Sequence, residues 1–162
     1  MERLKLLIAE GTEAFRIALL DALRGAYRVR TCEEGQQTLH LMQEFKPDVM
    51  ILDLMLPGLD GITLLQRAAE SGLRPMVLAT TSYQNPYILE SLQKLGVGYV
   101  MIKPCDLRAT IARLADLSQQ IYAPVVTQPD PQVQITNLLL AMGFQTRHHG
   151  YGYLRSAIGR MM

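Results

Sequence analysis

The stretch that most constrains the fold lies at residues 49–61, VMILDLMLPGLDG. Its apolar run ends on Asp53 and turn-forming residues follow, which is typical of a buried strand rather than a helix. Asp53 is therefore expected at the carboxyl end of a strand, the edge of an open α/β sheet where ligands bind. Asp60 is placed to cap the helix that follows. We expect the Asp53 carboxylate to be exposed and usable as a nucleophile; the alternative is that it only caps the strand end.

The same pattern of short apolar runs and amphipathic stretches continues along the chain. Alternating strands and helices predict an α/β fold, a (βα)5 doubly wound parallel sheet with helices on both faces. Thr12, Asp60 and Asp106 are the expected helix caps. The expected strands cover residues 4–9, 27–32, 49–53, 76–79 and 99–102, and the expected helices cover residues 13–24, 35–45, 62–71, 87–95 and 107–121.

Composition limits the partners that the chain can have. Sixteen Lys and Arg against 15 Asp and Glu give a formal charge of +1, so no overall field attracts nucleic acid or a membrane. The start of the chain lacks the apolar core of a signal peptide, and no run is long enough to span a bilayer. We therefore expect a cytoplasmic protein with no membrane partner. The two cysteines, Cys32 and Cys105, support neither a disulfide framework nor a metal site.

Polar side chains follow four of the expected strands, at Glu10, Asp53, Thr81 and Lys103. Side chains at the carboxyl ends of parallel strands converge at one edge of the sheet. An acid, a nucleophilic aspartate, a hydroxyl and an ammonium are the groups needed to phosphorylate a carboxylate. Each residue alone has an ordinary structural explanation. Lys103 could be a surface lysine, Thr81 could be a turn hydroxyl, and Glu10 could be a solvated loop acid. Their coincidence at four strand ends favours the site.

Residues 4–118 resemble the receiver domain of two-component response regulators, which is flavodoxin-like with strand order 2-1-3-4-5. The resemblance rests on Asp53 followed by Leu-Pro-Gly at 56–58 and Asp-Gly at 60–61, on Thr81 28 residues after Asp53, and on Lys103-Pro104 22 residues further on. It implies that Asp53 is the phosphoacceptor, Lys103 the phosphate-binding lysine and Thr81 the switch hydroxyl. It also implies that Mg²⁺ is held by Glu10, Asp53 and the main-chain carbonyl of Met55, and that a histidine kinase or phosphotransferase is the donor.

Two positions depart from the pattern of that family. The family usually carries two adjacent acids after its first strand, the second of which binds Mg²⁺, and this chain has Glu10-Gly11. We expect Glu10 to reach the cation directly, with water in the vacant position. The switch aromatic, usually three residues before the lysine, is replaced by Val100, and Tyr99 is expected on the opposite face of the strand.

The chain continues beyond the expected receiver of residues 1–121. Residues 122–132 carry three prolines and predict a linker. Residues 133–162 predict a short helical extension, too small for a core of its own, and residues 135–162 resemble the opening of the DNA-binding effector domain of stage 0 sporulation proteins. The DNA-reading helix of that domain would lie beyond Met162. The basic cluster at residues 147–160, with its adjacent histidines, is expected to be a solvated surface, or one that meets phosphate once the full domain exists, rather than a metal site.

Three functions remain open from the sequence. The leading interpretation is a phosphorylated receiver in a two-component or phosphorelay pathway that controls transcription, with sporulation as the process and a homodimer as an expected assembly. A degenerate receiver that binds partner proteins without metal or phosphate is the alternative, and Gly11 favours it. A flavodoxin-like enzyme or nucleotide binder is a third, but a GxGxxG or P-loop signature is absent.

Overall fold

Strands and helices alternate through residues 2–122, the part of the chain that the computed structural model describes. All five predicted strands and all five predicted helices are present there, with small shifts at their ends. The strands are β1 (Lys5–Ala9), β2 (Arg28–Cys32), β3 (Val49–Asp53), β4 (Met76–Thr81) and β5 (Tyr99–Ile102). The helices are α1 (Glu13–Leu23), α2 (Gly35–Phe45), α3 (Gly61–Glu70), α4 (Pro86–Lys94) and α5 (Leu107–Tyr122).

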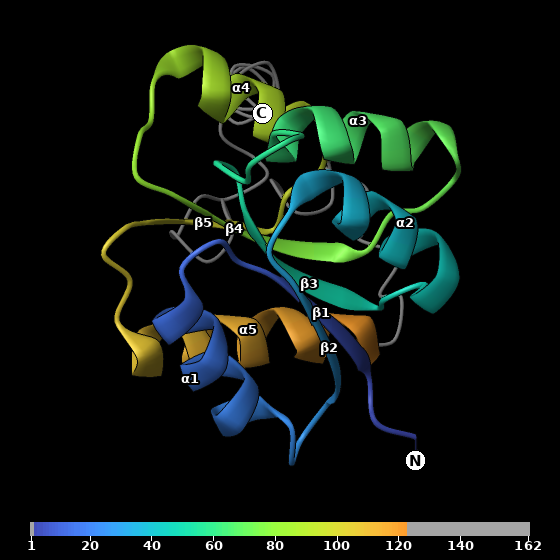
Figure 1. Ribbon diagram of the computed structural model, residues 1–162, viewed down its shortest axis with the longest axis vertical. Coiled ribbons are helices and arrows are strands. Elements are labelled where there is room, and N and C mark those ends of the chain that lie inside the picture. The colour runs from blue at the N-terminus through green and yellow to red at the C-terminus, as the bar shows by residue number, and fades with distance from the viewer. Residues whose placement is uncertain (1, 123–162) are drawn as a thin grey trace, which may run out of the picture. The chain divides into compact units, whose positions relative to one another are not determined.

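The five strands form one sheet in the order β2-β1-β3-β4-β5 (Figure 1), and every neighbouring pair is parallel. The predicted flavodoxin-like fold is therefore confirmed. β3 lies at the centre, and all of its residues are buried because strands flank it on both sides and helices cover both faces. Its last residue, Asp53, pairs in register with Thr80 of β4, so the ends of these two strands meet at the same edge.

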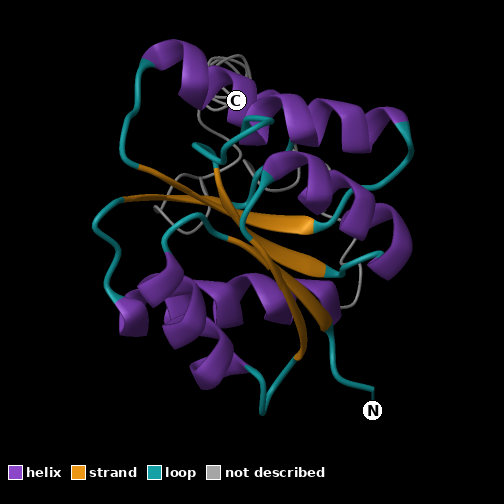
Figure 2. Ribbon diagram, in the orientation of Figure 1, coloured by secondary structure: helices purple, strands orange, loops and turns teal. Residues whose placement is uncertain are grey.

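Helices cover the sheet as two layers, with α2, α3 and α4 on one face and α1 and α5 on the other (Figure 2). Each layer has its own apolar core. Met42, Leu64 and Leu92 belong to the core under α2, α3 and α4, whereas Leu19 and Leu114 belong to the core under α1 and α5. The amphipathic patterns predicted from the sequence supply these inward faces.

Two of the three predicted helix caps are formed as expected. The Asp60 side chain accepts a hydrogen bond from the Thr63 amide at 2.9 Å, and Asp106 accepts one from the Ala109 amide at 2.9 Å. Burial alone would raise the pKa of Asp60, but its hydrogen bonds with Thr63 hold that pKa below its usual value. Thr12 occupies the cap position of α1, but its side chain makes no cap hydrogen bond.

Gly35, the first residue of α2, lies directly against the loop that follows β3. Its amide donates to the carbonyl of Pro57 at 2.9 Å, and a Cβ atom placed on it would collide with the main-chain carbonyl oxygen of Leu59. Because main chain cannot swing aside as the end of a side chain can, Gly35→Ala is expected to lower the free energy of unfolding by about 3 kcal/mol. Urea denaturation followed by circular dichroism measures this change.

Gly25→Ala provides the matched control for this prediction. A Cβ on Gly25 would meet nothing within 4 Å, so a change of only about 0.5 kcal/mol is expected. Equal effects of the two substitutions would contradict the close packing of α2 on the loop after β3.

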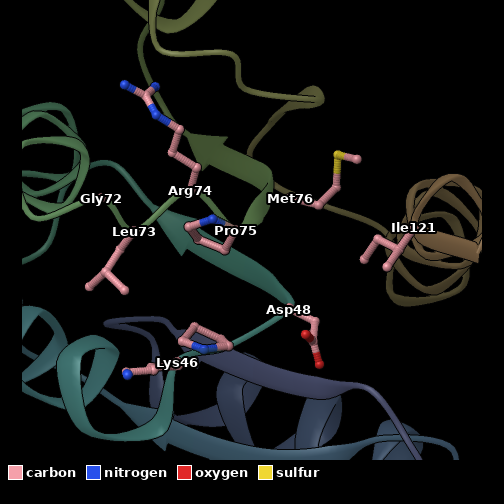
Figure 3. Close-up of a pocket in the computed structure, with 9 residues that line it drawn as sticks. Lys46, Asp48, Gly72, Leu73, Arg74, Pro75, Met76 and Ile121 are labelled. Carbon is pink, nitrogen blue, oxygen red and sulfur yellow. The ribbon is translucent and has the colours of Figure 1, made fainter. Parts of the chain in front are cut away.

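A pocket of about 330 Å³ opens at the amino ends of β3 and β4, beside the end of α5 (Figure 3). Asp48, Arg74 and Ile121 are among its lining residues. It lies at the edge of the sheet opposite to Asp53 and contains none of the predicted site residues.

The predicted linker at 122–132 falls outside the described residues except for Tyr122, the last residue of α5. The predicted extension at 133–162 and its basic cluster lie wholly outside them. Within residues 2–122, no helix is long and apolar enough to cross a membrane.

Candidate functional site

The four predicted site residues lie at the carboxyl ends of four parallel strands. Asp53 and Thr81 are the last residues of β3 and β4, and Glu10 and Lys103 directly follow β1 and β5. Three of them are in direct contact: the Lys103 ammonium lies 2.7 Å from Glu10 Oε1 and 3.0 Å from Asp53 Oδ2. Two acids from neighbouring strands therefore share one cation.

Asp53 is buried, with 4% of its surface exposed, which corrects the expectation of an exposed carboxylate. Its Oδ1 accepts a hydrogen bond from the Met55 amide at 2.9 Å, and its Oδ2 faces Lys103 and, at 3.4 Å, the Gly11 amide. The sequence showed that Asp53 ends a strand, but the loops that close over the strand end determine how much of it water can reach. The main-chain amides and Lys103 supply the donors that a buried carboxylate needs.

Glu10 is completely buried, so it is not a solvated loop acid. Its Oε1 binds Lys103 and also accepts from the Thr12 amide at 3.1 Å, and its Oε2 lies 3.5 Å from the Thr80 hydroxyl. A carboxylate removed from water in this way depends strongly on its counter-ion. Glu10 is thus as much a part of the buried site as Asp53.

The ionic contacts also change the proton affinity of Lys103. Burial alone would lower the pKa of Lys103, but hydrogen bonds with Glu10 and Asp53, together with their negative charges, raise it above its ordinary value. A raised lysine pKa means that the ion pairs stabilise the fold below the ordinary lysine value, as long as the two carboxylates are charged. This contribution is lost as the pH rises through the raised pKa, so Lys103 is charged throughout the neutral range.

Thr81 lies at the same edge of the sheet but is turned away from Asp53. Its hydroxyl donates to the Tyr83 carbonyl at 2.7 Å and accepts from the Tyr83 amide at 3.2 Å. Thr81 is fully buried, whereas the Tyr83 side chain is 60% exposed. The hydroxyl therefore joins the end of β4 to the main chain of the loop that leads into α4.

Thr80 and Arg16 are site residues that the sequence did not indicate. Thr80 pairs with Asp53 in the β3–β4 register, and its hydroxyl faces Glu10. Arg16, on α1, donates to the Glu10 carbonyl at 2.8 Å and forms an ion pair with Glu33 at 3.1 Å. Thr80 could have been found from the adjacent pair of threonines at the strand end. Arg16 carried no signal, because its partner is a main-chain atom.

Comparison with known proteins identifies the family to which this constellation belongs. The model of the response regulator receiver domain matches residues 6–115, which run from the second residue of β1 through β5 and into the first part of α5. The chain belongs to the response regulator receiver family.

Relatives of this receiver include the transcriptional regulatory protein AfsQ1 of Streptomyces coelicolor, which is 34% identical over 110 residues. The match covers 67% of this chain and 48% of that protein, so the chain spans about half the length of this curated relative. Among solved structures, the N-terminal domain of an uncharacterized protein from Wolinella succinogenes is similar, with a TM-score of 0.68 and 25% identity over 74% of this chain and 97% of that one. A CheY-like receiver from Methanospirillum hungatei shares the fold, with a TM-score of 0.68 and 18% identity over 75% of this chain and 98% of that one.

The position of the usual switch aromatic in this receiver is filled by a small apolar side chain. Val100 packs against the core under α2, α3 and α4, whereas Tyr99 is 45% exposed. Strand alternation places the two side chains on opposite faces, as predicted. The aromatic ring of Tyr99 is therefore not on the face that Val100 occupies.

A second pocket, of about 440 Å³, adjoins the ion pairs of the receiver between the start of α1 and the loop after β5. Phe15, Ser82 and Lys103 are among its lining residues. Cys105 also lines it, and burial raises the pKa of that thiol above its ordinary value. Lys103 thus forms part of the wall of this pocket, but Asp53 is not part of its lining.

Receiver domains generally bind Mg²⁺ at the phosphorylation site, and the oxygens predicted for it here are those of Glu10, Asp53 and the Met55 main chain. In residues 2–122 no group of three or more His, Cys, Asp and Glu side chains could hold a metal ion. Glu10 and Asp53 are both occupied by Lys103, and Gly11 provides no third carboxylate. The residues present therefore do not fit a divalent-cation site of carboxylates.

Proposed function

We propose that Asp53 accepts a phosphoryl group from a phosphohistidine of a histidine kinase or phosphotransferase. The observation that carries the proposal is the Lys103 ammonium 3.0 Å from the Asp53 carboxylate, at the carboxyl edge of a receiver sheet. A cation in that position can hold the oxygens of a phosphoryl group on Asp53. Because the acceptor is a side chain of the protein itself, the chain transmits a signal and does not act as a turnover enzyme.

In the proposed reaction an Asp53 oxygen attacks phosphorus, a new O–P bond forms and the donor's bond to phosphorus breaks. The electron pair leaves with the donor group, which takes a proton from water. The added group carries about two negative charges. Thr81 is the hydroxyl proposed to turn towards it, which requires that Thr81 give up its two hydrogen bonds with the main chain of Tyr83.

The output is proposed to be control of transcription. AfsQ1, the 34% identical relative, is named a transcriptional regulatory protein, and the receiver covers about half of its length. We propose the division of this chain into a receiver at 1–121, a linker at 122–132 and the start of a helical effector domain at 133–162. The resemblance of that last part to stage 0 sporulation proteins supports sporulation as the process and DNA binding by a complete effector domain. Homodimerisation is proposed as a response to the charge added at Asp53.

The test is mass spectrometry of the full chain after incubation with a small phosphodonor. One added phosphoryl group is expected, mapped to the peptide that contains Asp53. Asp21→Asn is the control, because Asp21 is an exposed acid of α1 and its loss should leave the modification unchanged. A phosphoryl group mapped to another peptide would overturn the assignment of the acceptor.

A second candidate is a receiver that binds partner proteins without phosphorylation, and Gly11 is the observation that favours it. Sedimentation with and without the phosphodonor distinguishes the two functions. The proposed function predicts that self-association changes when the phosphodonor is present. Identical association, together with an unmodified mass, would favour the second candidate.

A further inference from the structure

The Lys103 ammonium occupies the central position of the receiver site, between two buried carboxylates. Glu10 is 0% exposed and Asp53 is 4% exposed, yet both acids contact the same nitrogen, at 2.7 and 3.0 Å. Two negative charges held this close together in a dry environment need a cation between them. In the folded chain this cation is the ammonium of Lys103, the residue that directly follows β5.

The four carboxylate oxygens of the site all face donors from the protein. Lys103 and the Thr12 amide face Glu10 Oε1, and the Thr80 hydroxyl faces Oε2. The Met55 amide binds Asp53 Oδ1, while Lys103 and the Gly11 amide face Oδ2. Mg²⁺ requires a nearly ideal octahedron of oxygens around it and dehydrates reluctantly. To bridge Glu10 Oε1 and Asp53 Oδ2, Mg²⁺ would have to displace the tethered ammonium that contacts both of these oxygens.

Gly11 shows that the fold leaves room for another acid. A Cβ atom on Gly11 would lie 3.5 Å from Asp53 Oδ2, an ordinary contact distance, and the Gly11 backbone is not in the left-handed region. A Cβ atom at position 11 would therefore fit and would lie beside the acceptor carboxylate. The backbone does not exclude an acid at this position, but the sequence provides none.

We propose that Lys103 serves as the resident cation of this site, and that Asp53 is phosphorylated without a divalent metal ion. Glu10 is then a positioning residue, which holds the ammonium beside Asp53, and not a metal ligand. The inference rests on the proposed function. It adds that the charge on the transferred oxygens is offset by the Lys103 ammonium alone.

Isothermal titration of MgCl2 into the full chain tests the cation independently of phosphorylation. The wild type is expected to show no saturable Mg²⁺ binding up to about 10 mM. Gly11→Asp is expected to bind Mg²⁺ with a dissociation constant of about 1 mM or lower. Gly25→Asp adds the same charge where a Cβ meets nothing within 4 Å, and it should behave as the wild type does. Saturable wild-type binding below about 10 mM would overturn the inference.

Phosphorylation of the wild type with and without EDTA provides the second measurement. The rate with a small phosphodonor is expected to change by less than about twofold when EDTA removes divalent ions, because Lys103 remains in place. Phosphorylation that occurs only with Mg²⁺ would overturn the inference and leave the proposed function intact. Failure to phosphorylate under both conditions would overturn the proposed function, and the metal-free reaction with it.

Glu10→Gln separates a positioning residue from a metal ligand, because the amide keeps the shape of Glu10 but loses the charge that holds the ammonium. A fall in the phosphorylation rate of about tenfold is expected at every Mg²⁺ concentration. A loss that excess Mg²⁺ restores would show instead that Glu10 binds metal. Circular dichroism of the variant checks that the fold is retained.

Discussion

Replacing Lys103 with methionine is expected to lower the free energy of unfolding by about 3 kcal/mol at neutral pH. The substitution leaves Glu10 and Asp53 buried and close together with no counter-ion. The lower end of the range for a broken buried pair applies because the Lys103 side chain is 21% exposed, so water can partly replace it. Urea denaturation followed by circular dichroism measures the loss.

Two comparisons separate this charge effect from a packing effect. Acidification should remove most of the difference in free energy of unfolding between Lys103→Met and the wild type, because protonation neutralises the two unpaired carboxylates. At neutral pH, adding Asp53→Asn to Lys103→Met should remove part of that difference. Lys94→Met is the control: Lys94 is an exposed lysine paired with Glu90, and a change of about 0.5 kcal/mol or less is expected. If Lys103→Met lowers the free energy of unfolding equally at all pH values, the effect comes from packing of the lysine stem and not from its charge.

Asp53→Asn is expected to abolish phosphorylation completely while leaving the free energy of unfolding within about 1 kcal/mol of the wild type. An amide nitrogen or oxygen cannot form the acyl phosphate, so no added mass should appear. Stability changes little because two effects oppose each other. Removing one negative charge leaves Glu10 and Lys103 as a balanced pair, but the new amide presents a donor to Lys103 or to the Met55 amide.

Intact mass and urea denaturation together check this second expectation. An added phosphoryl group that persists in Asp53→Asn would place the acceptor on another acid, and Asp60 in the following loop is the first to examine by Asp60→Asn. A large loss of stability in Asp53→Asn would show that the hydrogen bonds to the carboxylate outweigh the repulsion between the two acids.

The strand that ends at Asp53 could be predicted because an apolar run followed by turn formers leaves few alternatives. The gathering of Glu10, Asp53 and Lys103 at one edge followed from the parallel sheet. The burial of Asp53 could not be predicted, because it depends on Lys103 and on the Gly11 amide, which lie in loops distant from Asp53 in the sequence. The orientation of Thr81 was equally hidden, since its partners are main-chain atoms of Tyr83.

The loops after β3 and β4 flank Asp53, and they differ in the hydrogen bonds that hold them in place. The first is anchored twice, by the Met55 amide on Asp53 and by the Gly35 amide on the Pro57 carbonyl. At the start of the second, the polar contacts of the Thr81 side chain are with Tyr83, within the loop itself. If Asp53 is phosphorylated as proposed, we expect the loop after β4 to move before the loop after β3 does. The surface around α4 would then report whether the site carries a phosphoryl group.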